Sequence, residues 1–137
     1  MKVPVVIDTN ILISGYLWKG TPRKVIRFAR SKNYELLYCT ESMTELVRIL
    51  SGKFHMDAWE VIRIVSDIKG IGRNIAVVSQ ESPISEDPTD NLFINMAIDG
   101  AARIIISGDS HLLKLKRYKE VEIIKAAEFL NKFGGKE

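Results

Sequence analysis

The chain has 137 residues, of which 46% are hydrophobic and 27% are charged, and its formal net charge at pH 7 is +3. This composition is that of a folded globular domain, and it excludes a disordered chain and a collagen-like repeat. The longest apolar runs have the length of a strand, far short of the roughly 20 residues that a membrane-spanning helix needs. We therefore expect one domain over residues 1–137 that does not enter a membrane. Because no signal-peptide pattern opens the chain, we expect a cytoplasmic protein.

Cysteine and histidine are too scarce for several kinds of site. The single cysteine, Cys39, has no partner for an internal disulfide, and one thiol does not make a zinc site. The two histidines, His55 and His111, are too few for a histidine-rich metal centre. The small positive net charge slightly favours an anionic partner.

Short apolar runs alternate along the chain with helical patterns. In chain order, the expected elements are a strand over residues 3–7, a helix capped by Thr21, a strand over 36–38, helices over 41–50 and 57–68, a strand over 75–78, a helix that begins at Asp87-Pro88 and ends at Gly100, a strand over 103–107, a helix over 110–115, a strand over 121–124 and a helix over 126–133. Strands separated by helices predict a parallel sheet that is covered on both faces. The expected fold is therefore α/β, a three-layer α/β/α sandwich around five parallel strands.

Acidic residues from four separate segments stand where such a sheet binds ligands. In an open parallel sheet, ligands bind outside the carboxyl ends of the strands. Asp8 directly follows the first predicted strand, and Asp109 follows the fourth. Glu45 lies in the helix after the second strand, and Asp90 lies at the start of the helix that leads into the fourth. We expect these four carboxylates to converge on one edge of the sheet.

Converging carboxylates repel one another, which raises their pKa values unless a cation compensates the charge. With no cysteine pair and no histidine-rich site, the ligands would all be oxygen atoms, a set that suits Mg²⁺ or Mn²⁺. At a phosphodiester, such a cation activates water as the nucleophile and stabilises charge on the attacking and leaving oxygen atoms.

Two of the acids have a good structural interpretation as well. Asp90 stands three residues after Asp87, in the first turn of the helix that Asp87-Pro88 opens, and the helix dipole favours an acid there. Glu45 stands three residues after Ser42, as in a capping box. Either residue could therefore stabilise a helix terminus without binding a ligand.

Capping explains Asp109 better than it explains Asp8. Asp109 follows Gly108, which is common turn chemistry, and it could cap the short helix after it. Asp8 instead lies between a buried strand and the apolar residues 11–13, so that its charge is held against the core. A common site explains the four acids together better than four unrelated structural roles do.

Four sequence motifs occur in the order that is typical of a known family. The motifs are VVIDTNILIS at residues 5–14, TESMTEL at 40–46, DPTDNLF at 87–93 and IISGDSHLL at 105–113. In these residues the chain resembles the PIN-domain family, and most closely the small bacterial and archaeal single-domain members, many of which are toxins of VapC-type toxin–antitoxin pairs. The resemblance implies a metal-dependent ribonuclease with a five-stranded parallel sheet, often a homodimer, that acts on RNA. Such a protein is either a toxin, whose partner is an antitoxin protein, or a housekeeping enzyme that processes cellular RNA, and the sequence does not separate the two.

By position in these motifs, the resemblance implies that the metal is bound by four acids: Asp8, Glu45, Asp90 and Asp109. It also implies that Asn10 and Ser107 hold the carboxylates and water in place. The three aspartates would bind the principal cation, Mg²⁺ or Mn²⁺, and Glu45 would orient the attacking water or share a second ion. RNA would then be hydrolysed by in-line attack of water on its phosphodiester.

Two further residues near the motifs have open roles. The family often carries another acid two residues after the fourth aspartate, and here that position is His111, which puts a second metal position in doubt. His111 would contact phosphate or transfer a proton, or it is simply exposed on the short helix. Asp87 either belongs to the site or caps a helix, and we favour the cap.

RNA would be held through its backbone by scattered basic side chains, which makes the affinity depend on salt. The candidates are Lys19, Arg23, Lys24, Arg27, Lys114 and Lys116. Among the aromatic residues, Tyr16 and Trp18 lie in a loop-like stretch and Trp59 lies in a helix. Core or loop packing is the favoured role for each of them, with a subunit interface as the alternative.

Two other classes of function compete with a nuclease. A dehalogenase-like phosphatase needs a second aspartate two residues after the first, and Asn10 at that position argues against it. A phosphoacceptor receiver domain usually has an acidic pair before its first strand's aspartate and a lysine late in the sheet, and neither pattern is clear. An RNA- or partner-binding PIN-like module with little or no turnover remains the main alternative, because metal binding and catalysis would use the same residues.

Overall fold

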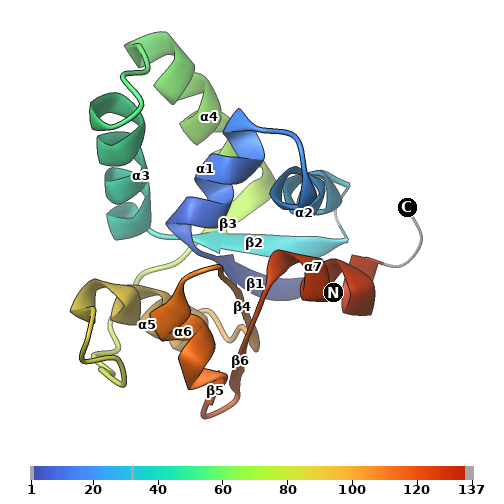
Figure 1. Cartoon of the computed structure of the whole chain (residues 1–137), viewed down its shortest axis with the longest axis vertical. Coiled ribbons are helices and arrows are strands. Elements are labelled where there is room, and N and C mark those ends of the chain that lie inside the picture. Colours follow the sequence, from blue (N-terminus) through green and yellow to red (C-terminus); the bar gives the residue numbers. More distant parts are fainter. Residues whose placement is uncertain (1, 32, 135–137) are drawn as a thin grey trace.

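The computed structural model describes residues 2–31 and 33–134, and its centre is a six-stranded sheet with the order β3-β2-β1-β4-β6-β5 (Figure 1). The strands are β1 (Val3–Ile7), β2 (Tyr34–Tyr38), β3 (Gly72–Asn74), β4 (Ile104–Ile106), β5 (Arg117–Tyr118) and β6 (Val121–Ile124). Five strands are parallel, whereas the short β5 runs antiparallel to β6 at one edge. The sheet is therefore mixed, with one strand more than the sequence predicts.

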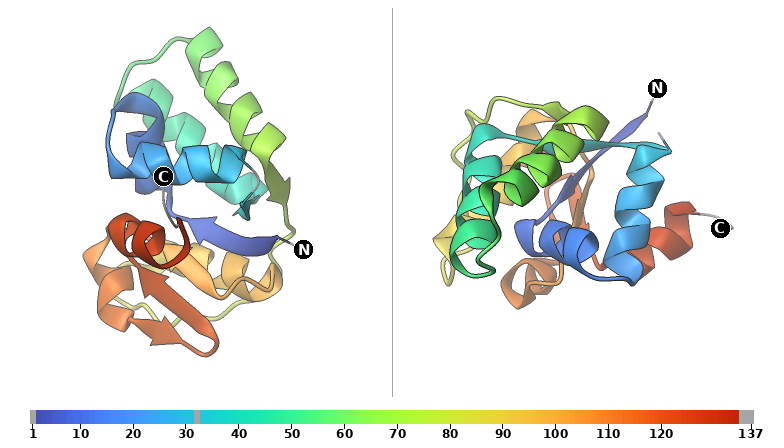
Figure 2. Two further views of the ribbon diagram at one scale, coloured as in Figure 1. Left: turned by 90° about the vertical axis from the view of Figure 1, so that its right-hand side faces the viewer. Right: turned by 90° about the horizontal axis from the view of Figure 1, so that it is seen from above.

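Helices cover both faces of the sheet (Figure 1, Figure 2). They are α1 (Thr9–Leu17), α2 (Thr21–Arg30), α3 (Thr40–Gly52), α4 (Ala58–Ile71), α5 (Asn91–Asp99), α6 (Ser110–Leu115) and α7 (Ala126–Phe129). Side chains of α1 to α4 and α7 pack in one core cluster, and side chains of α5 and α6 pack in a second. The predicted α/β class, with a largely parallel sheet between two helical layers, is confirmed.

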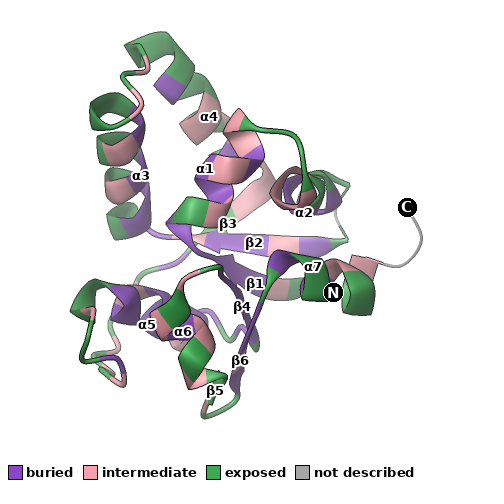
Figure 3. Cartoon of the chain, in the orientation of Figure 1, coloured by how far each residue is buried: buried purple, intermediate pink, exposed green. Residues whose placement is uncertain are grey.

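The central strands are buried on both faces. Along β1, Val5 and Ile7 belong to the core under the larger group of helices, and Val6 belongs to the core under α5 and α6. All three side chains are at most 2% exposed, and Figure 3 shows β4 and β6 buried in the same way. Because successive side chains of a strand point to opposite faces, burial of both faces gives an unbroken apolar run.

The third strand lies earlier in the chain than the sequence predicts. β3 pairs with β2, and the ladder is followed by one further bond, from the Ile75 N–H to the Tyr38 carbonyl (N···O 2.9 Å). Beyond it the chain leaves the sheet, and Val78 is 77% exposed. The prediction of a strand over residues 75–78 is therefore wrong. Ile75 is apolar because it packs in the core under α5 and α6.

The sequence patterns do not predict α1, because its residues have low helix propensity. Thr9, Ile11 and Ile13 are β-branched, and Gly15 interrupts the segment. Tertiary packing overrides these preferences, since Ile13 is buried and the helix lies directly against α2. A Cβ atom at position 15 would lie 2.3 Å from the Ile26 Cδ1 atom, which would have to move, and 3.0 Å from the Pro22 carbonyl oxygen, so that glycine favours the close approach of α1 and α2.

The helix termini follow the predictions with small differences. The N-cap of α2 is Gly20, with φ 139°, so that Thr21 is the first helical residue and not the cap. The last predicted helix is α7 followed by a π-helical turn over Leu130–Gly134. Among the helices of the described residues, none has the length and hydropathy needed to span a bilayer.

The aromatic residues differ in their packing. Tyr16 lies in α1 and contacts the core, and Trp18 packs edge-on against Phe54 although it is 53% exposed. Trp59 is 75% exposed at the start of α4. Core packing is therefore the wrong interpretation for Trp59, which lies on the surface together with Ile62.

Candidate metal centre

The acidic residues gather where the sheet topology reverses. The chain passes from β1 to β2 and β3 on one side, and then crosses to β4 and β6 on the other side of β1. The Asp8 N–H donates to the Ile106 carbonyl (3.0 Å), and the Ser107 N–H donates to the Ile124 carbonyl (2.9 Å). These bonds place Asp8 and Ser107 side by side at the carboxyl ends of β1 and β4. This is the position at which open α/β sheets bind ligands.

Asp8 is buried but well supplied with hydrogen bonds. It is 3% exposed and forms the N-cap of α1, where one carboxylate oxygen accepts from the Ile11 N–H (2.9 Å). The other oxygen accepts from the Ser107 hydroxyl. Burial raises the pKa of Asp8, and these hydrogen bonds oppose the rise. The carboxylate is therefore held in one orientation at the end of β1.

Asp109 begins α6 and is linked to Asp8 through Ser107. Its Oδ1 atom accepts from the N–H groups of His111 (2.8 Å) and Leu112 (3.2 Å). The Asp109 N–H donates to the Ser107 Oγ atom (2.9 Å), the same hydroxyl that donates to Asp8. Asp109 thus caps the helix, and the cap holds its carboxylate beside the other acids.

Asp90 is the least satisfied of the acids. It lies between a 3₁₀ turn (Pro88–Asp90) and α5, is 8% exposed and makes no side-chain capping bond. Its buried Oδ2 atom has no hydrogen-bond partner in the described part of the chain. Burial raises the pKa of Asp90 to about 7, and the adjacent Asp109 carboxyl, followed by the charges of Asp87 and Asp8, adds to the rise. A favourable interaction with a helix terminus does not account for such a residue.

His111 and Asp87 complete the group. One ligand atom from each of Asp87, Asp90, Asp109 and His111 lies within 4.8 Å of the others. His111 Nδ1 is 3.8 Å from Asp109 Oδ1 and 4.0 Å from Asp90 Oδ2, so that His111 is more than an exposed residue of α6. Asp87 occupies the N-cap position of the 3₁₀ turn, as predicted, but its carboxylate accepts from the Thr89 hydroxyl (2.6 Å) and makes no capping hydrogen bond to the turn.

Asp8, Glu45 and Asn10 lie outside this group of four, although Asp8 is linked to Asp109 through the Ser107 hydroxyl. Glu45 is half-buried in the second turn of α3, and Asn10 is exposed in the first turn of α1. The capping box of α3 is formed by Cys39 and Ser42, so the predicted box between Ser42 and Glu45 is wrong. Helix capping therefore does not explain why an acidic residue stands at position 45.

The roles of Asp87 and His111 stay open in the sequence, where each residue shows only its short spacing from a predicted metal-binding aspartate. Asp87 precedes Asp90 by three residues, the length of the 3₁₀ turn that brings the two carboxylates together. His111 follows Asp109 by two residues, within the first turn of α6 that Asp109 caps. The cap therefore brings the imidazole to the same place as the carboxylate.

The donor set fits a divalent cation. Three carboxylates and one imidazole lie within a few ångströms, and the described chain places neither lysine nor arginine in ion-pair contact with Asp90 or Asp109. A buried carboxylate oxygen without a partner is costly in a protein interior and needs an explanation such as a bound ion. A cation at this point would compensate the mutual repulsion that raises the pKa of Asp90.

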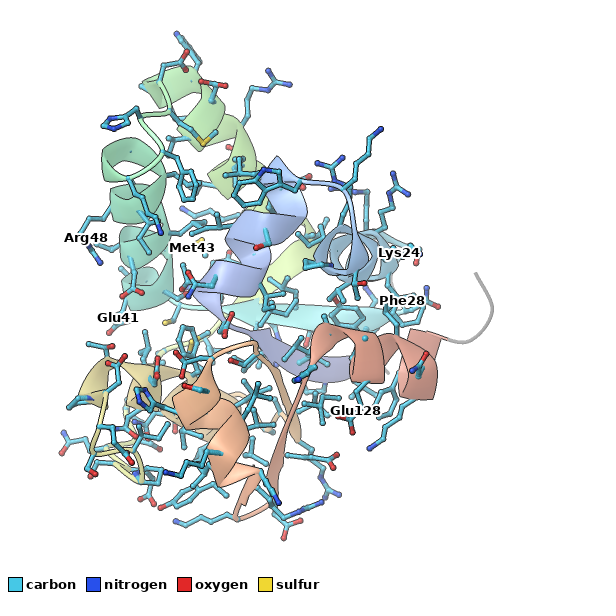
Figure 4. All side chains as sticks on the ribbon, in the orientation of Figure 1. Lys24, Phe28, Glu41, Met43, Arg48 and Glu128 are labelled. Atoms are coloured by element: carbon cyan, nitrogen blue, oxygen red, sulfur yellow. The ribbon has the colours of Figure 1, made fainter. Side chains whose placement is uncertain are left out.

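The basic residues proposed as RNA contacts lie in different surroundings. The Arg23 guanidinium donates to the carbonyls of Gly15 (3.2 Å) and Tyr16 (3.4 Å) at the end of α1. Lys24 lies on α2, on the opposite side of the view from α5 and α6 (Figure 4). Lys114 and Lys116 are exposed in and directly after α6, the helix that Asp109 caps. These two lysines are the basic candidates nearest in sequence to the site.

Comparisons with known proteins agree with this geometry. The family model of the PIN domain matches residues 4–111. The uncharacterized protein MJ1680 of Methanocaldococcus jannaschii is 28% identical over 121 residues, which cover 85% of this chain and 77% of that protein.

The crystal structure of PAE2754 from Pyrobaculum aerophilum superposes with a TM-score of 0.53 at 12% identity, covering 99% of this chain and 100% of that one, and so shows a shared fold. PIN domains are generally metal-dependent nucleases. With the family model spanning most of its length, the chain belongs to the PIN-domain family.

Proposed function

We propose that the protein is a divalent-metal-dependent endoribonuclease that hydrolyses RNA phosphodiesters. The observation that carries the proposal is the buried Asp90 carboxylate, which lies next to Asp109 and whose Oδ2 atom has no hydrogen-bond partner among the described residues. A protein gains nothing in stability from such a group, whereas a metal-dependent nuclease requires it.

The acids have distinct roles in this proposal. Asp90 and Asp109 hold the cation, and Asp8 contributes from the end of β1, where Ser107 fixes its orientation. Glu45, on α3, lies outside this group and orients the attacking water. When bound, Mg²⁺ or Mn²⁺ would supply activation of water and stabilisation of charge on the phosphodiester oxygens.

The substrate class rests on the family and on charge. PIN-domain nucleases act on nucleic acids, and a formal net charge of +3 favours a polyanion. We propose RNA, held through its backbone by the exposed Lys114 and Lys116 beside the acidic group. Affinity for RNA should then fall as the salt concentration rises.

The cellular role proposed for this activity is that of a cytoplasmic toxin of a toxin–antitoxin pair, acting as a homodimer. What supports a protein partner is the exposed apolar surface of α3 and α4, where Val47, Trp59 and Ile62 are 37%, 75% and 52% exposed. Light scattering of the purified protein, alone and after co-expression with its genomic neighbour, measures both associations.

The test is cleavage of labelled structured and unstructured RNAs with Mg²⁺, with Mn²⁺ and with EDTA. We expect metal-dependent cleavage by the wild type, and a loss of at least about 100-fold in Asp8→Asn, because a metal-binding carboxylate becomes a neutral amide. Asp67→Asn, which alters an acid of α4 that is paired with Arg30, is the control and should remain active. Cleavage that persists in EDTA or in Asp8→Asn would contradict the proposal. RNA binding without cleavage by the wild type would favour the binding-module alternative.

A further inference from the structure

His111 provides the one nitrogen donor of the acidic group. Its Nδ1 atom is buried and has no hydrogen-bond partner in the described chain, and Asp90 Oδ2 beside it is in the same condition. The Asp90 side chain is 12% exposed, and its Oδ2 atom is buried. Buried polar atoms are otherwise paired with a hydrogen-bond partner. One unpartnered oxygen atom and one unpartnered nitrogen atom this close together therefore indicate that a ligand binds between them.

The separations between these atoms fit a shared cation better than a direct contact. The distances of 4.0 Å to Asp90 Oδ2 and 3.8 Å to Asp109 Oδ1 are too long for hydrogen bonds. Two donors that would each bind an octahedral ion at about 2.1 Å lie about 3.0 Å apart in adjacent positions and about 4.2 Å apart in opposite positions. Both observed distances fall within this interval.

The local structure fixes the backbone that carries the imidazole. His111 is the second residue of α6, and its N–H donates to the Asp109 Oδ1 atom (2.8 Å). The same interaction that caps the helix therefore holds the backbone of His111 against the carboxylate. Ser107 in turn binds the Asp109 N–H, so that the start of α6 is tied to β4.

We propose that His111 Nδ1 is a ligand of the divalent cation, together with Asp90 and Asp109, and that this nitrogen donor makes the site prefer a first-row transition-metal ion such as Mn²⁺ over Mg²⁺. The inference rests on the proposed function and refines its metal. Mg²⁺ strongly prefers oxygen ligands, whereas imidazole suits transition metals. At this position the family pattern often has an acid, so the selectivity would be a property of this chain.

The first test is electron spin echo envelope modulation of Mn²⁺ bound to the full chain, from which any histidine tag has been removed. We expect nitrogen coupling in the wild type that disappears in His111→Asp. The only other histidine in the chain is His55, so His55→Asn is the matched control and should keep the coupling. Asparagine suits position 55, because the φ angle there is 51°.

The second test is calorimetric titration of Mn²⁺ and Mg²⁺ into the wild type and His111→Asp. We expect the ratio of Mn²⁺ to Mg²⁺ affinity to fall at least about tenfold in the variant. Mn²⁺ binding that requires Asp90 but shows no nitrogen coupling and an unchanged ratio would overturn the inference and leave the nuclease proposal standing. If Mn²⁺ does not bind the wild type at all, both the proposed metal-dependent nuclease and the His111 ligand would be contradicted.

Discussion

Two aspartates in this molecule, Asp67 and Asp90, have opposite environments. Asp67, on α4, accepts hydrogen bonds from both terminal nitrogens (Nη1 and Nη2) of the Arg30 guanidinium and from the hydroxyl of Tyr16, each at 2.6 Å. The guanidinium holds the pKa of Asp67 below its usual value. Asp90, at the start of α5, lies close to Asp109 and to His111 Nδ1 (4.0 Å), and burial together with the neighbouring acids raises its pKa to about 7.

The comparison separates two uses of a carboxylate. Where Asp67 joins α1, α2 and α4, the chain supplies the countercharge and the donors, and the group stabilises the fold. Where Asp90 lies, the chain supplies further negative charge, which makes the metal-free fold less stable and the site more attractive to a cation. Substitutions at the two positions should therefore have opposite effects on stability.

The largest expected effect is a gain in stability for Asp90→Asn without metal. Because the pKa of Asp90 is raised in the folded state, stability falls as the pH rises from about 4, the ordinary pKa, to about 7. At pH 8, removal of the charge should raise the free energy of unfolding by on the order of 2 kcal/mol. This is less than the whole pKa shift of Asp90 corresponds to, because part of that shift depends on Asp109. Urea unfolding at pH 5 and pH 8 in EDTA measures this gain, and a variant less stable than the wild type at pH 8 would contradict the view that the Asp90 charge destabilises the metal-free fold.

Ser107→Ala should cost about 1–2 kcal/mol, because a buried hydroxyl bound to Asp8 and to the Asp109 N–H is lost. The same change should weaken Mn²⁺ binding about tenfold, since the carboxylate of Asp8 loses a group that orients it. Ser110→Ala, an exposed position of α6, serves as the control. Equal Mn²⁺ affinity in both variants would contradict a role of Ser107 in orienting the carboxylates for metal binding.

Asp67→Asn should cost about 1 kcal/mol at pH 7, because Arg30 and Tyr16 lose a charged acceptor that is only partly buried. The stabilising effect of a lowered pKa is present above about pH 4 and is lost as the pH falls through the folded-state value. The difference between variant and wild type should therefore vanish in strong acid. A difference that grows in acid would contradict the ion-pair explanation.

The smallest expected effect is that of Glu45→Gln on metal binding. Glu45 lies outside the group of donor atoms, so its loss should change Mn²⁺ affinity less than about threefold while reducing RNA cleavage. Titration and cleavage measured on the same preparation separate the two effects. A loss of metal affinity as large as that of Asp90→Asn would place Glu45 among the ligands.

The parts of the site that follow strands are the parts that sequence reasoning predicts. Asp8 and Asp109 come after β-branched runs that are buried on both faces, and such runs mark strand ends reliably. Since parallel strands end at the same edge of a sheet, their convergence follows. The sequence does not predict helix α1, because packing against α2 overrides the low helix propensity of its residues.

The roles of Asp87 and His111 depend on side-chain positions that only tertiary structure determines. A 3₁₀ turn brings Asp87 to Asp90, and the cap of a six-residue helix brings His111 to Asp109. Neither turn leaves a periodic pattern in the sequence. The same limitation applies to Glu45, whose distance from the other acids is set by how α3 packs on the sheet.

The central claim is that the uncompensated carboxylates bind a divalent cation, and calorimetric titration of Mn²⁺ tests it most directly. The wild type and Asp67→Asn should bind Mn²⁺ with equal affinity, whereas Asp90→Asn should bind it at least about tenfold more weakly. Equal affinity in all three proteins, or no binding to the wild type, would contradict the account.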